Sequence, residues 1–222
     1  MISNRLSYEI LDLKDSNNYS LEKFQGAYSF WKSQWREFFI ENKMDEHLVS
    51  DEFTRADSAG VLFYEDKIAS IILFKERDLT LQCWRDDSYF KIWPETLLTK
   101  LAHDKITKVM SAGYLTVHPL LRGDQFRPSL KNIMVALVGC HLTHTSAQAA
   151  ICVTNNLKGV NSSTERCGWN LAAAGLELFQ HPVNLYVLSQ DNARAALLEN
   201  SNVNQMVHSL YPTLNQKKLK MA

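Results

Sequence analysis

The stretch from residue 114 to residue 144 constrains the fold most, because it predicts a strand, a loop and a helix in direct succession. Residues 114–117 end in the β-branched Thr116 and Val117, which is typical of a strand, and Pro119 stops it. Apolar residues then recur every three or four positions, which predicts a helix over 129–144 with Pro128 in its first turn. A strand joined to a helix in this way indicates a mixed α/β chain.

The loop between that strand and that helix has the composition of an anion site. A helix N-terminus presents unpaired N–H groups and the positive end of the helix dipole. Arg122 and Arg127 stand on either side of Gly123 and would add charge-assisted hydrogen bonds. The alternative is an ordinary connection whose arginines are simply solvated.

The rest of the chain shows alternating helical and strand patterns without an internal repeat. An aromatic amphipathic helix is expected over 20–40, followed by a polar stretch over 41–58. The other expected elements are strands 61–64 and 68–74, a helix opened by Trp93-Pro94, a strand 149–153, a short helix ended by Gly168, strands 176–179 and 183–188 broken by His181-Pro182, and a last helix 192–211.

Composition is that of a globular chain with no strong charge. Lys plus Arg and Asp plus Glu both number 24, so nothing favours a nucleic-acid partner, and no apolar run is long enough to span a bilayer. We expect one domain over 1–222 with a solvated tail over 212–222. The four cysteines show no close pairing, which favours a reducing cytoplasm.

The order Val117-His118-Pro119-Leu120-Leu121-Arg122-Gly123 before an amphipathic helix resembles the acyl-donor loop of the GNAT acyltransferases. Farther on, the strand 149–153 and a helix closing in Gly168-Trp169 resemble that family's fifth strand and the helix after it. The resemblance implies the GNAT-like fold, an α/β (α+β) mixed sheet flanked by helices. It also implies an acyl thioester of coenzyme A or acyl carrier protein as the donor.

The resemblance further assigns the donor site. It implies that the donor lies between the strands ending at 117 and 153, which part there, with the backbone of Leu115 and Val117 facing the thioester carbonyl. The residues implied in donor binding are Val117, Arg122, Gly123, Asp124, Gln125 and Arg127. Gln125 and Arg127 stand where the family has small residues that let backbone approach a pyrophosphate, so a carrier protein's single phosphodiester is consistent with this loop.

The first half of the chain resembles one branch of the family. The aromatic helix, the acidic segment 51–57 and Asp87-Ser88-Tyr89-Phe90 resemble the N-acyl amino acid synthases and acyl-homoserine-lactone synthases. An arginine of the lactone synthases has no counterpart at 71–74, and Arg77 is the nearest. This absence favours the amino acid synthases over lactone synthesis. The aromatic helix offers more apolar wall than an acetyl group needs, so we expect a medium- or long-chain acyl group, with Trp31, Trp35 and Phe38 lining its pocket or else serving as plain core.

Amine attack on a thioester needs a base, and the candidate bases are Glu52, Asp57 and Glu76, with His118 as a further one. Each carboxylate could equally be a solvated loop residue. The family's usual tyrosine acid has Thr164 in its place. His141 and His144 lack a third ligand nearby, so no metal is expected.

The sequence thus predicts an N-acyltransferase that acts on a small amine. Two alternatives stay open: a GNAT-shaped binding or regulatory module without catalysis, and a short-chain N-acetyltransferase that uses acetyl-coenzyme A. Convergence of Arg122 and Arg127 on one anion site would separate the acyltransferase from the binding module.

Overall fold

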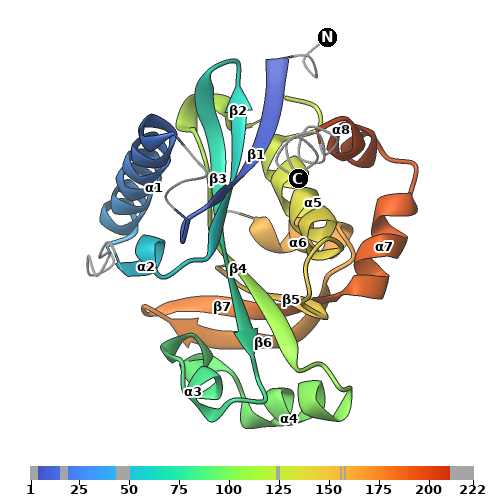
Figure 1. Cartoon of the computed structure of the whole chain (residues 1–222). Coiled ribbons are helices and arrows are strands. Elements are labelled where there is room, and N and C mark those ends of the chain that lie inside the picture. The colour runs from blue at the N-terminus through green and yellow to red at the C-terminus, as the bar shows by residue number, and fades with distance from the viewer. Residues whose placement is uncertain are drawn as a thin grey trace. The chain divides into compact units, whose positions relative to one another are not determined.

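A computed structural model describes residues 5–15, 20–43, 51–123, 126–155, 157 and 159–210. The chain forms two compact units, each built from separate segments: the first from 1–75, 113–137 and 199–222, the second from 76–112 and 138–198. Seven strands form one mixed sheet in the order β1-β2-β3-β4-β5-β7-β6. The predicted α/β mixed sheet is confirmed (Figure 1). Strands β3 and β4 each run through both units.

The first unit contains an antiparallel meander. β1 (Leu6–Asp12) pairs with β2 (Ser58–Tyr64), which pairs with β3 (Lys67–Asp78). A tight turn at 65–66 joins β2 to β3, where the sequence pattern predicts a turn over 65–67, and Glu65 has the positive φ of 55° typical of such hairpin turns. β1 was not expected from the sequence, although its buried residues Leu6, Tyr8 and Leu11 contribute to the core.

Helices flank these strands. α1 (Leu21–Glu41) begins at Ser20, whose side chain accepts a hydrogen bond from the Lys23 N–H, and it confirms the predicted aromatic helix. Figure 1 shows α1 and the short α2 (Asp51–Thr54) on one side of β2 and β3. The same unit includes α8 (Asn202–Leu210), which contacts β1, and the first part of α5 (Leu130–Leu142).

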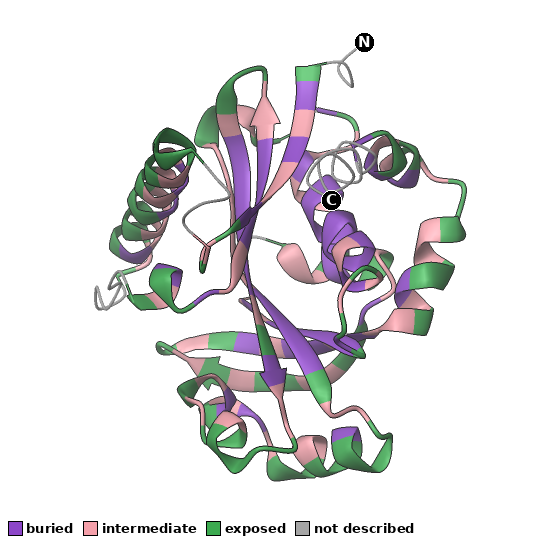
Figure 2. Ribbon diagram, viewed as in Figure 1, coloured by how far each residue is buried: buried purple, intermediate pink, exposed green. Residues whose placement is uncertain are grey.

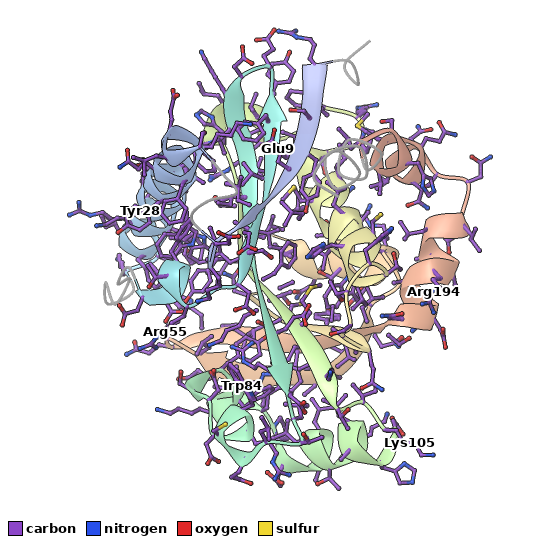
Figure 3. The ribbon with its side chains drawn as sticks, in the orientation of Figure 1. Glu9, Tyr28, Arg55, Trp84, Lys105 and Arg194 are labelled. Atoms are coloured by element: carbon purple, nitrogen blue, oxygen red, sulfur yellow. The ribbon has the colours of Figure 1, made fainter. Side chains whose placement is uncertain are left out.

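The core of the first unit explains the aromatic pattern of α1. Buried residues of β2 and β3 pack against α1 and α2, and the exposed side of α1 is green in Figure 2. Tyr28, labelled in Figure 3, packs against this core. The fully buried members of the cluster are Ala27, Trp31, Phe53, Ala59, Val61 and Ile71.

The second unit combines mixed strands with short helices. β5 (Ala149–Asn155) is antiparallel to β7 (His181–Ser189), and β7 is antiparallel to β6 (Asn170–Leu178). The first part of β4 (Lys108–Val117) runs parallel to β5. The helices are α3 (Gln82–Arg85), the 3-10 helix η2 (Ser88–Ile92), α4 (Glu95–His103), α6 (Val160–Arg166) and α7 (Gln190–Leu198).

Several expected boundaries were wrong. The single helix over 192–211 is two helices, α7 and α8, because Ser201 caps α8 by accepting from the Asn204 N–H at 3.1 Å. The side-chain amide of Asn204 also donates to the Glu199 carbonyl, which stabilises the turn between α7 and α8. The tail over 212–222 lies outside the described residues.

Two proline positions also differ from expectation. Pro182 does not break the strands but is the second residue of β7, because the turn lies at Phe179-Gln180, where both residues have positive φ. Pro128 precedes the first turn of α5, since Ser129 occupies the capping position and accepts from the Asn132 N–H at 3.4 Å.

Within the described part of the chain, no helix has both the length and the apolar character that a bilayer crossing requires.

Candidate functional site

The site centres on β4, whose two ends differ in their pairing. The parallel ladder with β5 consists of the pairs Val109–Ala149, Met110–Ala150 and Ser111–Ile151. β4 continues to Val117 and β5 to Asn155, and both stretches are fully described. No rung of the β4–β5 ladder includes Leu115 or Val117. The continuous pairing that would exclude a donor at this strand is therefore absent.

Side chains from three neighbours fix the carbonyl groups of the segment 113–117. The Trp35 indole N–H donates to the Tyr114 carbonyl at 3.0 Å, and the Ser70 hydroxyl donates to the Thr116 carbonyl at 2.6 Å. The Arg122 Nε donates to the Val117 carbonyl at 2.8 Å. Side chains of α1, β3 and the following loop thus add hydrogen bonds to this part of β4, which also neighbours β3 in the sheet.

Tyr114 is the most unusual residue of the segment. Its φ of 57° places a bulky residue in the left-handed region, which L-residues with large side chains rarely adopt. The Trp31 and Trp35 rings meet its ring edge-on, with centroid separations of 5.7 and 5.1 Å. Such contacts stabilise a conformation that costs free energy by itself. Tyr114 was not predicted as a site residue, because no sequence pattern signals a positive φ at tyrosine.

The Tyr114 hydroxyl is hydrogen-bonded to the Glu52 carboxylate of α2. Burial raises the pKa of Tyr114 well above its usual value of 10, and the charge of Glu52 and this hydrogen bond raise it further. The phenol therefore stays protonated and donates to Glu52. Glu52 is half-buried, so a candidate base stands beside the segment of β4 that lacks β5 pairing.

The other two candidate carboxylates lie in different surroundings. Asp57 is half-buried between α2 and β2, where its N–H donates to the Phe74 carbonyl at 2.8 Å and its carbonyl accepts from the Leu13 N–H at 2.9 Å. Glu76 is exposed on β3 in the second unit and accepts from the Ser146 hydroxyl at 3.3 Å.

His118 is tied to the start of the donor loop. Its Nδ1 accepts from the Leu120 N–H at 3.3 Å, so the neutral ring has its proton on Nε2. The ring stacks on Phe30 of α1, with centroids 6.0 Å apart.

The donor loop begins with the 3-10 helix η3 (Pro119–Leu121). Gly123 is exposed with a φ of 87°, the backbone freedom for which glycine is suited. The Arg122 NH2 donates to the Gln34 Oε1 of α1 at 3.3 Å, so Arg122 joins the end of β4 to α1. Arg127 has an exposed side chain. Asp124 and Gln125 lie outside the described residues.

The three expected acyl-pocket residues differ in exposure. Trp31 is fully buried, and its indole N–H has no acceptor among the described residues. Trp35 and Phe38 are half-buried, with ring centroids 5.1 Å apart. A Cβ added at Gly113 would meet no described heavy atom within 4 Å, so there is open space beside this part of β4.

Position 164 offers no free hydroxyl for acid catalysis. Thr164 is buried and its hydroxyl donates to the Val160 carbonyl at 2.9 Å within α6. In the part of the chain that the structure describes, no three metal-ligating side chains form a group.

Comparison with known proteins supports the fold. No family model matches the chain, and no curated protein matches it by sequence. The structure is similar to that of FeeM, an N-acyl amino acid synthase from uncultured soil microbes, with a TM-score of 0.59 and 12% identity over 86% of this chain and 95% of that one. It is also similar to the AHL synthase LasI, with a TM-score of 0.54 and 10% identity over 93% and 95% of the two chains.

A third similar structure is Escherichia coli ElaA, with a TM-score of 0.54 and 11% identity over 83% of this chain and 99% of that one. The chain therefore has the fold of the GNAT acyltransferases, as the motif order predicted.

Proposed function

We propose that this protein is an N-acyltransferase that moves a medium- or long-chain acyl group from a thioester to the amine of a small amino compound. The observation that carries the proposal is the segment 113–117 of β4, which lacks β5 pairing and has the half-buried Glu52 hydrogen-bonded to its Tyr114. Similarity in fold to FeeM, an N-acyl amino acid synthase, supports the same chemistry.

In the proposed complex the donor's pantetheine arm runs along residues 113–117. Backbone groups of Leu115 and Val117 face the thioester, where fixed N–H donors would stabilise the charge that develops on the carbonyl oxygen. Open space beside Gly113 gives the thioester room. Gly123, Arg122 and Arg127 hold the donor phosphate in this proposal, and α5 begins directly after this loop.

Glu52 is the proposed general base. The amine nitrogen attacks the thioester carbon, its proton passes to the Glu52 carboxylate, and the C–S bond breaks as the amide C–N bond forms. Tyr114 donates to Glu52 and orients it. The thiolate leaves as an anion and takes its proton from solvent, because Thr164 uses its hydroxyl within α6.

The proposed acyl pocket uses the half-buried aromatic residues of α1. Trp35 is bonded to the Tyr114 carbonyl, so its ring lies next to the proposed thioester position. Phe38 extends that wall, and Trp31 supports it from within the core. The donor is carried by acyl carrier protein or by coenzyme A.

An acyl-transfer assay tests the proposal. Purified protein is incubated with decanoyl-carrier protein, decanoyl-coenzyme A or acetyl-coenzyme A and a panel of amino acids and small amines. Release of free thiol and formation of the amide are then measured. We expect amine-dependent thiol release that falls stepwise in Gly113→Ala and Gly113→Val, because added side-chain volume fills the open space.

Two outcomes would contradict the proposal. Binding of a donor without amide formation with any amine would favour the non-catalytic module. Equal rates in the wild type and Gly113→Val would show that the donor does not bind beside this segment.

A further inference from the structure

Arg77 is a buried arginine in the second unit, near the end of β3, and only 6% of its surface is exposed. Its Nε lies 3.4 Å from the Asp87 carboxylate, and its NH1 donates to the Ser111 hydroxyl at 2.6 Å. The guanidinium carbon lies 4.5 Å from the centre of the Tyr89 ring and 5.7 Å from that of Phe90. An ion pair, a hydrogen bond and two aromatic faces therefore hold this cation.

This Arg77 cluster (Arg77, Asp87, Tyr89) contacts both strands of one particular rung. Ser111, bonded to Arg77, is the last residue of β4 that pairs with β5, and its partner in that rung is Ile151. The Tyr89 hydroxyl donates to the Ile151 carbonyl at 3.4 Å. The cluster therefore contacts both strands at the last rung of their ladder.

The cluster also has a fixed internal geometry. Asp87 caps η2, since its Oδ1 accepts from the Tyr89 N–H at 2.9 Å, and Tyr89 and Phe90 pack against the core of this unit. A planar guanidinium with several fixed donors can orient a hydroxyl and a carboxylate at once, whereas a lysine ammonium cannot reproduce that fork. An apolar side chain of similar volume commonly serves stability as well as a buried ion pair does. A position-setting role explains why an arginine stands here.

We infer that Arg77 is a positioning residue that fixes the last β4–β5 rung and thereby sets where the donor-binding edge of β4 begins. This inference rests on the proposed function. The parallel ladder consists of the rungs 109–111, so the position of its last rung determines where the edge without β5 pairing begins. Without Arg77 the last β4–β5 rung is less firmly fixed, so the segment from Gly113 onward begins from a less defined position, although Trp35, Ser70 and Arg122 still bond its carbonyl groups.

The test compares Arg77→Met and Arg77→Lys with Arg85→Met, a matched change at an exposed arginine of α3. The probe is decanoyl-coenzyme A, and the readouts are its dissociation constant and the hydrogen exchange of backbone amides 109–117. In Arg77→Met we expect a folded protein with at least tenfold weaker donor binding and at least tenfold faster exchange at 110–112. Arg77→Lys should be intermediate, and Arg85→Met should match the wild type.

A folded Arg77→Met with donor affinity within twofold of the wild type and unchanged exchange would overturn the inference. If that variant does not fold, Ser111→Ala decides, because it removes the Arg77–Ser111 hydrogen bond and leaves the Asp87 ion pair. A shift in the same direction supports the inference, and unchanged affinity and exchange overturn it. A wild type that binds no thioester refutes the proposed function, while faster exchange in Arg77→Met would still show that Arg77 fixes the last rung.

Discussion

The two halves of β4 are stabilised in different ways. Residues 109–112 are buried, and 109–111 form backbone pairs with β5. Residues 113–117 are half-buried, and carbonyl groups among them accept hydrogen bonds from Trp35, Ser70 and Arg122. The first half is distinguished by burial and by pairing with β5, and the second half by side-chain hydrogen bonds to its carbonyl groups. A strand segment held in that second way can keep its shape while it binds a ligand.

The second half also carries the strain. Tyr114 has a positive φ, and its phenol is bonded to Glu52, whereas the residues of the first half have no such backbone exception. Strained residues persist where surrounding contacts over-determine them, which occurs often at functional sites. The contrast between the two halves is therefore also a contrast between scaffold and proposed site.

We expect the largest effect from a substitution at Glu52, which is bonded to Tyr114 in the second half of β4. Glu52→Gln retains an acceptor for the Tyr114 hydroxyl but removes the base, so we expect acyl transfer to fall by about 10²–10⁴-fold with little change in thermal stability. Steady-state kinetics and a thermal melt check this. Asp51→Asn, at the exposed neighbour paired with Arg55, is the control and should retain full activity. Full activity in Glu52→Gln would show that Glu52 is not the general base.

The second largest expected effect is the preference for a long acyl chain over acetyl. Each buried methylene is worth about 0.8 kcal/mol, so a pocket that holds four methylenes more than acetyl needs would favour the longer donor by roughly 100-fold or more. A competition between acetyl- and decanoyl-coenzyme A measures this ratio. Trp35→Ala should reduce it, because Trp35 lies against Tyr114. Equal or better use of acetyl-coenzyme A would leave the aromatic helix as core only.

The arginines of the donor loop should show a smaller effect. Arg122→Ala and Arg127→Ala should each weaken donor binding by roughly 1–3 kcal/mol if both form charge-assisted bonds to its phosphate. Arg122→Ala should also lower the melting temperature slightly, because Arg122 joins Val117 to Gln34. Calorimetric titration with donor gives both affinities, and Arg55→Ala is the control. Unchanged affinity in both variants would assign the two arginines to the solvated surface.

The smallest effect concerns alkaline stability. The pKa of Tyr114 is raised in the folded protein, so above about pH 10 the unfolded chain releases the phenol proton first and the free energy of unfolding falls as the pH rises. Tyr114→Phe removes this titration and should flatten the fall between about pH 9 and pH 11. Melting curves of both proteins over that range measure it; identical slopes would mean that the phenol is not buried against Glu52.

Regular periodicity made most of the scaffold predictable. The aromatic period of α1, the hairpin of β2 and β3 and the strand–loop–helix of β4 and α5 all repeat over enough residues to be recognised. β1 and α2 were missed because short elements depend on tertiary pairing more than on their own pattern. The break between α7 and α8 depends on one serine cap, which a continuous helical period conceals.

The sequence predicted the location of the candidate site on β4 and the following loop from the order of its motifs, but not the partners of individual residues. Glu52 was one of three equal carboxylates in the sequence, and only the fold gives it Tyr114 as a partner. In the sequence, Arg77 was only the arginine nearest to the position where the lactone synthases have one. Its bonds to Ser111 and Asp87 depend on contacts between distant segments. Long-range partners of this kind leave no spacing signature in a single sequence.

The central claim is that residues 113–117 of β4 bind the acyl donor. A crystal structure with a thioether analogue of decanoyl-phosphopantetheine tests it most directly. We expect the pantetheine arm to lie along the backbone from Gly113 to Val117, with the sulfur near Tyr114 and the phosphate at the loop of Gly123. An analogue bound elsewhere, or rungs between β4 and β5 that continue past Ser111 and fill this edge, would contradict it.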